Sequence, residues 1–162
     1  MSVRLQITSL NATAALARAV TAELRPGSVV LLSGELGAGK TTFTKALAEA
    51  VGVEEEVTSP TFTIMRPYEA QFSFGPASLL HLDAYRLGGP EPFDDLGLFE
   101  LLDSGAVAVI EWGDLVAVAF PEALMIEFTL LEDDTRTAAL TGDVECVNRI
   151  AADLHTRGLL SC

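Results

Sequence analysis

The sequence predicts an α/β fold, with a mostly parallel central sheet, antiparallel edge strands and helices on both faces. Short apolar runs alternate along the chain with longer stretches in which apolar residues recur at helical spacing. One apolar run, 29–32, leads through a glycine-rich turn directly into a helix start at Lys40. With 162 residues and no internal repeat or linker-like segment, the chain is expected to form one domain over 1–162.

The elements follow from the local pattern. Strands are expected where apolar and polar residues alternate or where a short apolar run lies between turn residues: 3–7, 28–33, 61–68, 77–83, 106–111, 123–131 and 135–141. Helices are expected where apolar residues recur at helical spacing: about 10–24, 40–51, 93–104 and 143–157. Ser9 or Asn11 is expected to cap the first helix. The strands 61–68 and 77–83 are expected to pair as a hairpin, after an exposed acidic loop.

The turn after the run 29–32 carries a phosphate-binding pattern. Gly34 and Gly39-Lys40-Thr41 fit G-x-x-x-x-G-K-[ST], the phosphate loop of nucleoside triphosphatases. Its glycines allow positive φ, and the helix start favours an anion. Lys40 can reach the β- and γ-phosphates, and the Thr41 hydroxyl can join the ligands of Mg²⁺. A nucleoside triphosphate and Mg²⁺ are therefore expected. The alternative, a glycine turn that happens to contain a lysine, is disfavoured by the flanking strand and helix.

Two strand-end carboxylates, Asp83 and Glu111, are expected at the same edge of the sheet as this loop. One could anchor Mg²⁺ through water while the other orients the attacking water, and the sequence leaves this assignment open. Each could instead cap a helix or pair with an arginine. Thr61 is either a switch hydroxyl that senses the γ-phosphate or the ordinary start of a strand. His81 is expected to be a satisfied buried imidazole, and Trp112 a core anchor or a site-lining ring.

The charge balance limits the possible partners. The formal net charge is −13, with 10 Lys and Arg residues against 23 Asp and Glu residues, so the surface is expected to repel nucleic acid and anionic membranes. If RNA is involved, a partner is expected to hold it. The chain has no signal-peptide pattern and no apolar run that could span a bilayer, and its cysteines lack metal-ligand spacing. A reduced, cytoplasmic protein is expected.

Four short motifs follow one another along the chain: GELGAGKTTF at 34–43, SPTFT at 59–63, HLDAYRL at 81–87 and EW at 111–112. With LGL at 96–98, their order and spacing resemble the signature set of the bacterial TsaE (YjeE) ATPase family. The resemblance covers nearly the whole chain. One departure is Gly113-Asp114, where many relatives have Pro-Glu.

The resemblance implies an ATPase needed for threonylcarbamoyladenosine formation in tRNAs that read ANN codons. It implies TsaB and TsaD as partners: TsaD transfers the threonylcarbamoyl group, and ATP hydrolysis supports repeated turnover. It also implies that Lys40 holds phosphates, that Thr41 and Glu111 serve Mg²⁺, and that Asp83 supports hydrolysis. The other implied site residues are Glu35, Leu36, Gly37, Ala38 and Gly39 in the loop, Thr42 at the α-phosphate, Thr13 and Arg136 near the base, and Thr61 as the switch.

Two other functions stay open. A small-molecule kinase usually needs several arginines in a lid, whereas the arginines here are scattered along the chain. A nucleotide-dependent binding module without significant turnover would use the same loop. No Asn-Lys-x-Asp guanine-reading motif occurs in the sequence, which favours adenine.

Overall fold

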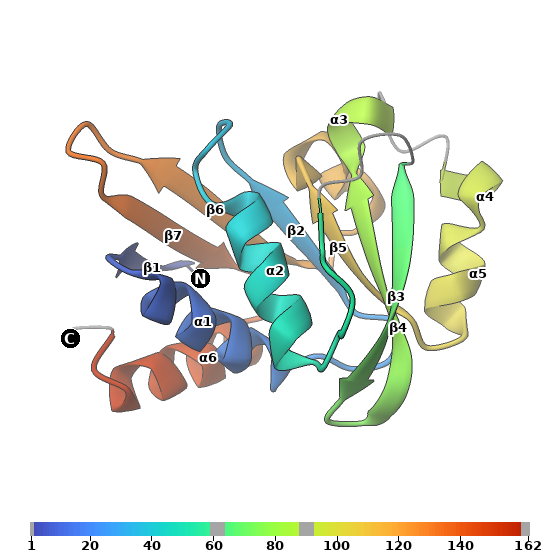
Figure 1. Ribbon diagram of the computed structural model, residues 1–162, viewed down its shortest axis with the longest axis horizontal. Helices are drawn as coiled ribbons and strands as arrows, with labels where there is room; N and C mark the ends of the chain where they lie inside the picture. Colours follow the sequence, from blue (N-terminus) through green and yellow to red (C-terminus); the bar gives the residue numbers. More distant parts are fainter. Residues whose placement is uncertain (1, 59–63, 88–92, 160–162) are drawn as a thin grey trace.

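The computed structural model describes residues 2–58, 64–87 and 93–159, and within them one sheet carries helices on both faces (Figure 1). The strands are β1 (Ser2–Ile7), β2 (Val29–Ser33), β3 (Met65–Phe72), β4 (Gly75–Asp83), β5 (Val107–Glu111), β6 (Leu124–Leu130) and β7 (Arg136–Thr141). The helices are α1 (Leu10–Thr21), α2 (Lys40–Ala50), α3 (Ala84–Leu87), α4 (Phe93–Leu96), α5 (Leu98–Asp103), the 3₁₀ helix η1 (Gly113–Ala119) and α6 (Val144–Thr156). Among the helices described, none is long and apolar enough to cross a membrane.

The sheet is mixed, with strand order β1-β7-β6-β2-β5-β4-β3. Its centre, β6-β2-β5-β4, is parallel, whereas β3 pairs antiparallel at one edge and β7 and β1 do so at the other. The prediction of antiparallel edge strands is confirmed. The prediction of a mostly parallel sheet holds only for the centre, because parallel and antiparallel pairings number three each.

Side chains of the central strands alternate between two hydrophobic cores. On β2, Val30 and Leu32 face the core beneath α1, α2 and α6, whereas Leu31 faces the core beneath α5 and η1. Strands buried on both faces need apolar residues at every position. This burial explains why 29–32 is a continuous apolar run rather than an alternating one.

The helix boundaries differ from the predicted ones where a glycine or a cap decides them. Ser9, not Asn11, caps α1: its Oγ accepts a hydrogen bond of 3.1 Å from the backbone N–H of Ala12. The single helix expected over 93–104 is wrong, because Gly97 has φ 70° and separates α4 from α5. The short helices α3 and η1 were not predicted, since each is too short for a periodic pattern.

The predicted hairpin is present, with different limits. β3 and β4 pair antiparallel from Met65 opposite Leu82 to Phe72 opposite Gly75, so both strands reach farther towards the turn than expected. The residues 61–63 that were expected to begin the strand lie outside the described residues.

The register brings three strand ends to one edge of the sheet. Glu111, the last residue of β5, pairs with Leu32 on β2 and with Asp83 on β4. The loop 34–39 follows β2 at the same edge and leads into α2 (Figure 1). Backbone pairing alone therefore places the loop beside both predicted carboxylates.

Candidate functional site

The loop 34–39 takes backbone conformations that favour glycine. Gly34, Gly37 and Gly39 have φ of 134°, 81° and 125°. A Cβ on Gly34 would also overlap the carbonyl oxygen of Phe128 on β6, whereas one on Gly37 would meet nothing within 4 Å. Gly34 is therefore required by its backbone and by close packing against β6, and Gly37 by its backbone alone.

Lys40, the first residue of α2, is 5% exposed although it is a lysine. Its Nζ donates hydrogen bonds to the carbonyl oxygens of Gly34 and Glu35, the latter at 3.0 Å, and lies 4.1 Å from the centroid of the Trp112 ring. Burial lowers the pKa of Lys40, while the nearby carboxylates, Glu111 foremost, partly offset that effect. A cation held beneath a glycine loop at a helix N-terminus can bind an anion such as phosphate.

Glu111 is the buried carboxylate of the site, with 5% exposure. Its Oε1 accepts a 2.8 Å hydrogen bond from the Thr41 hydroxyl, and its Oε2 lies 2.5 Å from Nε2 of His81. Burial alone would raise the pKa of Glu111. The hydrogen bonds from His81 and Thr41 and the charge of Lys40 outweigh burial and leave that pKa below its ordinary value. Glu111 is therefore an anion joined to the first turn of α2.

Asp83 lies beside Glu111 in the register but has different partners. Its Oδ1 accepts a 3.1 Å hydrogen bond from the backbone N–H of Tyr85, and its Oδ2 lies 3.5 Å from Nε of Arg86. The side chain of Asp83 is 17% exposed, more than that of Glu111. The sequence left open that Asp83 caps a helix or pairs with an arginine. The structure shows both contacts, at the edge of the sheet where the loop lies.

A pocket of about 570 Å³ opens beside the loop. Three predicted nucleotide contacts line it together with Ala38 and Gly39: Thr13 of α1, Thr42 of α2 and Arg136 of β7. Nε of Arg136 donates a 3.3 Å hydrogen bond to the carbonyl oxygen of Gly37 and so joins β7 to the loop. The structure therefore brings these residues to the same side of the loop, where they line one pocket.

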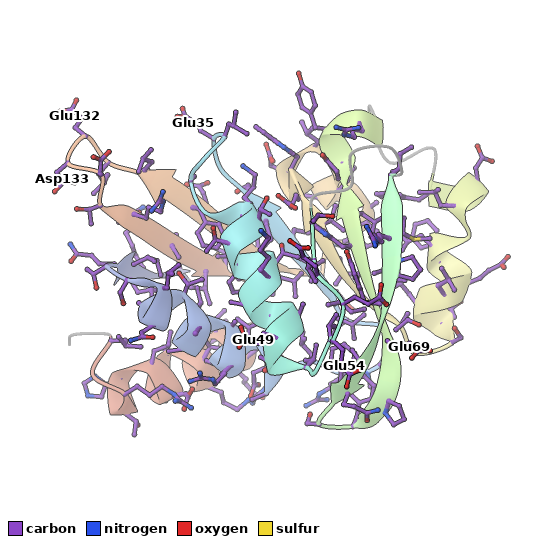
Figure 2. The ribbon with its side chains drawn as sticks, in the orientation of Figure 1. Glu35, Glu49, Glu54, Glu69, Glu132 and Asp133 are labelled. Carbon is purple, nitrogen blue, oxygen red and sulfur yellow. The ribbon has the colours of Figure 1, made fainter. Side chains whose placement is uncertain are left out.

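The remaining predicted site residues lie at the tip of the loop or outside the described residues. Leu36 is 89% exposed and Glu35 points outward at the tip of the loop, while the acidic Glu132 and Asp133 mark the tip of the β6–β7 hairpin (Figure 2). The hydrogen bond between Lys40 and Glu35 is made by the backbone carbonyl oxygen of Glu35 and not by its side chain. Thr61 lies outside the described residues.

The donors around Thr41 suit Mg²⁺. A hydroxyl and a carboxylate offer the oxygen ligands that this cation prefers. In the described ranges no group of three or more His, Cys, Asp or Glu side chains could hold a metal by itself. Mg²⁺ commonly keeps waters and takes its other ligands from substrate phosphates. The side chains of Thr41 and Glu111 therefore fit a magnesium ion that arrives with a nucleotide.

Three contacts of the site were not predicted, because they join residues from different elements. They are the pairing of His81 with Glu111, the Trp112 ring over Lys40, and the packing of Gly34 on Phe128. Trp112, at φ 59°, also packs against Tyr85, with 5.4 Å between the ring centroids. For His81 the sequence does hold one local signal. His81 and Asp83 are two residues apart, so they share a face of their strand, and His81 is thereby placed on the same face as a predicted site carboxylate.

The structure also explains why residue 113 of this chain is a glycine. A Cβ at this position would lie 2.5 Å from Cβ of Leu31 and 2.9 Å from its Cα. The start of η1 therefore packs directly on β2 and has no room for a side chain. The departure from Pro-Glu at 113–114 leaves the Lys40–Thr41–Glu111 arrangement in place.

The family model and the curated relatives agree on one family. The family model described as "Threonylcarbamoyl adenosine biosynthesis protein TsaE" matches residues 7–138. The tRNA threonylcarbamoyladenosine biosynthesis protein TsaE of Treponema pallidum is 46% identical over 114 residues, or 70% of this chain and 81% of the relative. The protein of the same name from Bacillus subtilis is 41% identical over 130 residues, 80% of this chain and 78% of the relative. The crystal structure of Bacillus subtilis YdiB superposes with a TM-score of 0.73 at 30% identity, covering 98% of this chain and 97% of that one.

The fold and the site thus define an α/β protein whose glycine-rich loop, buried lysine and hydrogen-bonded threonine–glutamate pair meet at one edge of a mixed sheet. With the family model matching most of its length, the chain belongs to the TsaE family.

Proposed function

We propose that this chain is a Mg²⁺-dependent phosphate-loop ATPase that acts with TsaB and TsaD in threonylcarbamoyladenosine modification of tRNA. The observation that carries the proposal is the hydrogen bond between Thr41 and Glu111 beside the buried Lys40. Phosphate-loop proteins hold Mg²⁺ with the Ser or Thr of the loop and with a carboxylate from a neighbouring strand. Membership of the TsaE family supplies the pathway.

The proposed roles follow from position. Lys40 and the backbone of 35–39 hold the β- and γ-phosphates, while Thr42, Thr13 and Arg136 contact the rest of the nucleotide in the pocket of about 570 Å³. Thr41 and Glu111 hold Mg²⁺, which when bound neutralises charge that develops on the phosphates. Thr61 remains the proposed switch.

The two carboxylates take separate roles in this proposal. Glu111 serves the metal because Thr41, itself a proposed ligand, donates to it. Asp83 orients the attacking water because it is more exposed and lies next to Glu111 in the register. Its contacts with Tyr85 and Arg86 fix its carboxylate. In this proposal Asp83 acts on the attacking water and is not needed to bind the nucleotide.

The partners supply what the isolated chain lacks. With a net charge of −13, the chain is expected to leave tRNA to the partner complex, since phosphate-backbone binding depends on Lys and Arg. Tight, salt-sensitive binding of tRNA to the isolated chain would contradict this part of the proposal. Its place of action is the cytoplasm.

Phosphate release from ATP tests the activity. We expect slow release by the isolated chain and faster release with saturating TsaB and TsaD from the same organism, because partner docking can raise the population of the competent state. An arginine provided by a partner would add about 10³–10⁵-fold. Transfer of phosphate to a small acceptor would instead identify a kinase. Nucleotide binding without turnover, alone and with partners, would identify a binding module.

A further inference from the structure

His81 is a fully buried imidazole with one polar contact to the residues that the structure describes. It lies on β4 with 0% exposure, and its Nε2 meets Oε2 of Glu111. Its other ring nitrogen, Nδ1, has no hydrogen-bond partner among the described residues. Burying a polar ring with an unpaired nitrogen is unfavourable, and an apolar side chain would fill the same space without that cost. The contact with Glu111 is therefore what distinguishes histidine from a hydrophobic residue at this position.

The direction of the hydrogen bond follows from the chemistry of the two groups. A carboxylate can only accept, so the hydrogen between His81 and Glu111 is carried by Nε2. The other carboxylate oxygen, Oε1, accepts from the Thr41 hydroxyl. Glu111 is thus held from two sides, by β4 through His81 and by α2 through Thr41. These two bonds fix the rotation of its carboxylate.

The same bonds determine how Thr41 is oriented. A hydroxyl has one hydrogen and two lone pairs. When its hydrogen is directed at Glu111, the Thr41 oxygen can meet a cation only through a lone pair. Residues that orient a metal ligand from behind commonly change metal affinity by about 10- to 100-fold when they are removed.

We infer that His81 is a positioning residue for Mg²⁺: by donating from Nε2 to Oε2 of Glu111, it keeps Oε1 directed at Thr41 and the Thr41 lone pairs directed at the metal. The inference rests on the proposed function, because the proposed function assigns Mg²⁺ to Thr41 and Glu111. It concerns binding of the metal with its nucleotide and requires no proton transfer by His81.

Amide substitutions at 81 separate this role from simple filling of the core. The side-chain nitrogen of glutamine reaches about as far as Nε2 of histidine, whereas that of asparagine corresponds to Nδ1. His81→Gln therefore keeps a donor within reach of Glu111, and His81→Asn and His81→Leu do not. His155, the other histidine, is exposed on α6, so His155→Asn is the matched control.

The measurement is the affinity for ATP, by titration calorimetry, with Mg²⁺ and again with EDTA. The ratio of the two dissociation constants gives the gain from Mg²⁺. We expect this gain to fall about 10- to 100-fold in His81→Asn and His81→Leu, to be largely kept in His81→Gln, and to be unchanged in His155→Asn. Affinity in EDTA should be the same in all of them, because the loop and Lys40 are untouched.

A wild-type gain from Mg²⁺ in either folded variant without the donor, His81→Asn or His81→Leu, overturns the inference. Thermal unfolding identifies the folded variants, and having two of them protects against the failure of one. If the wild-type chain gains nothing from Mg²⁺, or does not bind ATP, the proposed function itself is wrong and the inference falls with it.

Discussion

Helices α1 and α2 lie side by side on one face of the sheet, but they begin in different ways (Figure 1). α1 is preceded by Ser9, whose side chain caps the first turn. α6 is preceded likewise by Asp143, whose carboxylate accepts from the N–H of Cys146 at 2.9 Å. The residue before α2 is Gly39, which has φ 125° and offers no side-chain cap, and α2 then starts with a buried lysine, Lys40.

We infer from this difference that the starts of α1 and α6 serve stability, whereas the start of α2 serves binding. The first turns of α1 and α6 each receive a hydrogen-bond acceptor from a capping side chain of their own chain, which stabilises the helix start. The start of α2 combines a glycine loop of positive φ with a buried cation, a combination that favours an anion. Sites that depart from local rules in this way are expected to be functional.

The largest expected effect is at Lys40. Lys40→Ala removes the cation beneath the loop, so turnover should fall about 10²–10³-fold and ATP affinity should weaken. The other lysine of the chain, Lys45, is exposed on the same helix, and Lys45→Ala should leave both quantities unchanged. Phosphate release and titration calorimetry on the two variants give the comparison. Equal behaviour of the two folded variants would remove Lys40 from the site.

The next largest effects are expected at the two carboxylates, which should differ in whether turnover or Mg²⁺-dependent binding is lost. Asp83→Asn should keep ATP affinity and lower turnover by about a hundredfold, because it impairs the orientation of water. Glu111→Gln should weaken Mg²⁺-dependent binding itself. Each substitution is isosteric, so binding and turnover measured side by side give the assignment. The reverse pattern would exchange the two roles, and two mild phenotypes would place neither acid in the site.

The glycines of the loop should differ in stability. Gly34→Ala puts a methyl group against the Phe128 carbonyl oxygen at φ 134°, so backbone strain and overpacking together should cost about 3 kcal/mol of unfolding free energy. Gly37→Ala has open space at φ 81° and should cost about 1–2 kcal/mol, from strain alone. Urea denaturation of both variants measures the difference. A larger loss at 37 than at 34 would contradict the packing of the loop on β6.

The smallest effect is expected at a helix start far from the loop. Asp143→Ala removes the cap of α6 and should cost about 1 kcal/mol of unfolding free energy. ATP affinity should not change, because α6 contributes no residue to the loop or to the pocket beside it. Urea denaturation and calorimetry measure the two quantities. A marked loss of affinity in this variant would mean that the helix starts are not independent.

Much of the fold could be predicted because its signals are local. Alternation and apolar runs identify the strands, and the run 29–32 also indicates a strand buried on both faces. The order β1-β7-β6-β2-β5-β4-β3 depends on long-range pairing and left no such signal. The break at Gly97 was missed because a helical pattern of apolar residues continues across it.

The site divides in the same way. Lys40 and Thr41 follow from the glycine pattern, and Asp83 and Glu111 from their places at strand ends, which the register brings together. The contacts of His81 and Trp112 could not be predicted, because they depend on which strand neighbours which and on a left-handed backbone at 112. Local patterns therefore identified the groups of the site, and only the fold showed how those groups hold one another.

The most direct test of the central claim is titration of ATP into the wild-type chain by calorimetry, in Mg²⁺ and in EDTA. If the start of α2 is built for the phosphates of a nucleotide and Thr41 and Glu111 for its metal, ATP should bind at a single site, and Mg²⁺ should tighten that binding. The absence of binding at millimolar ATP under both conditions, with the chain folded, would contradict the account.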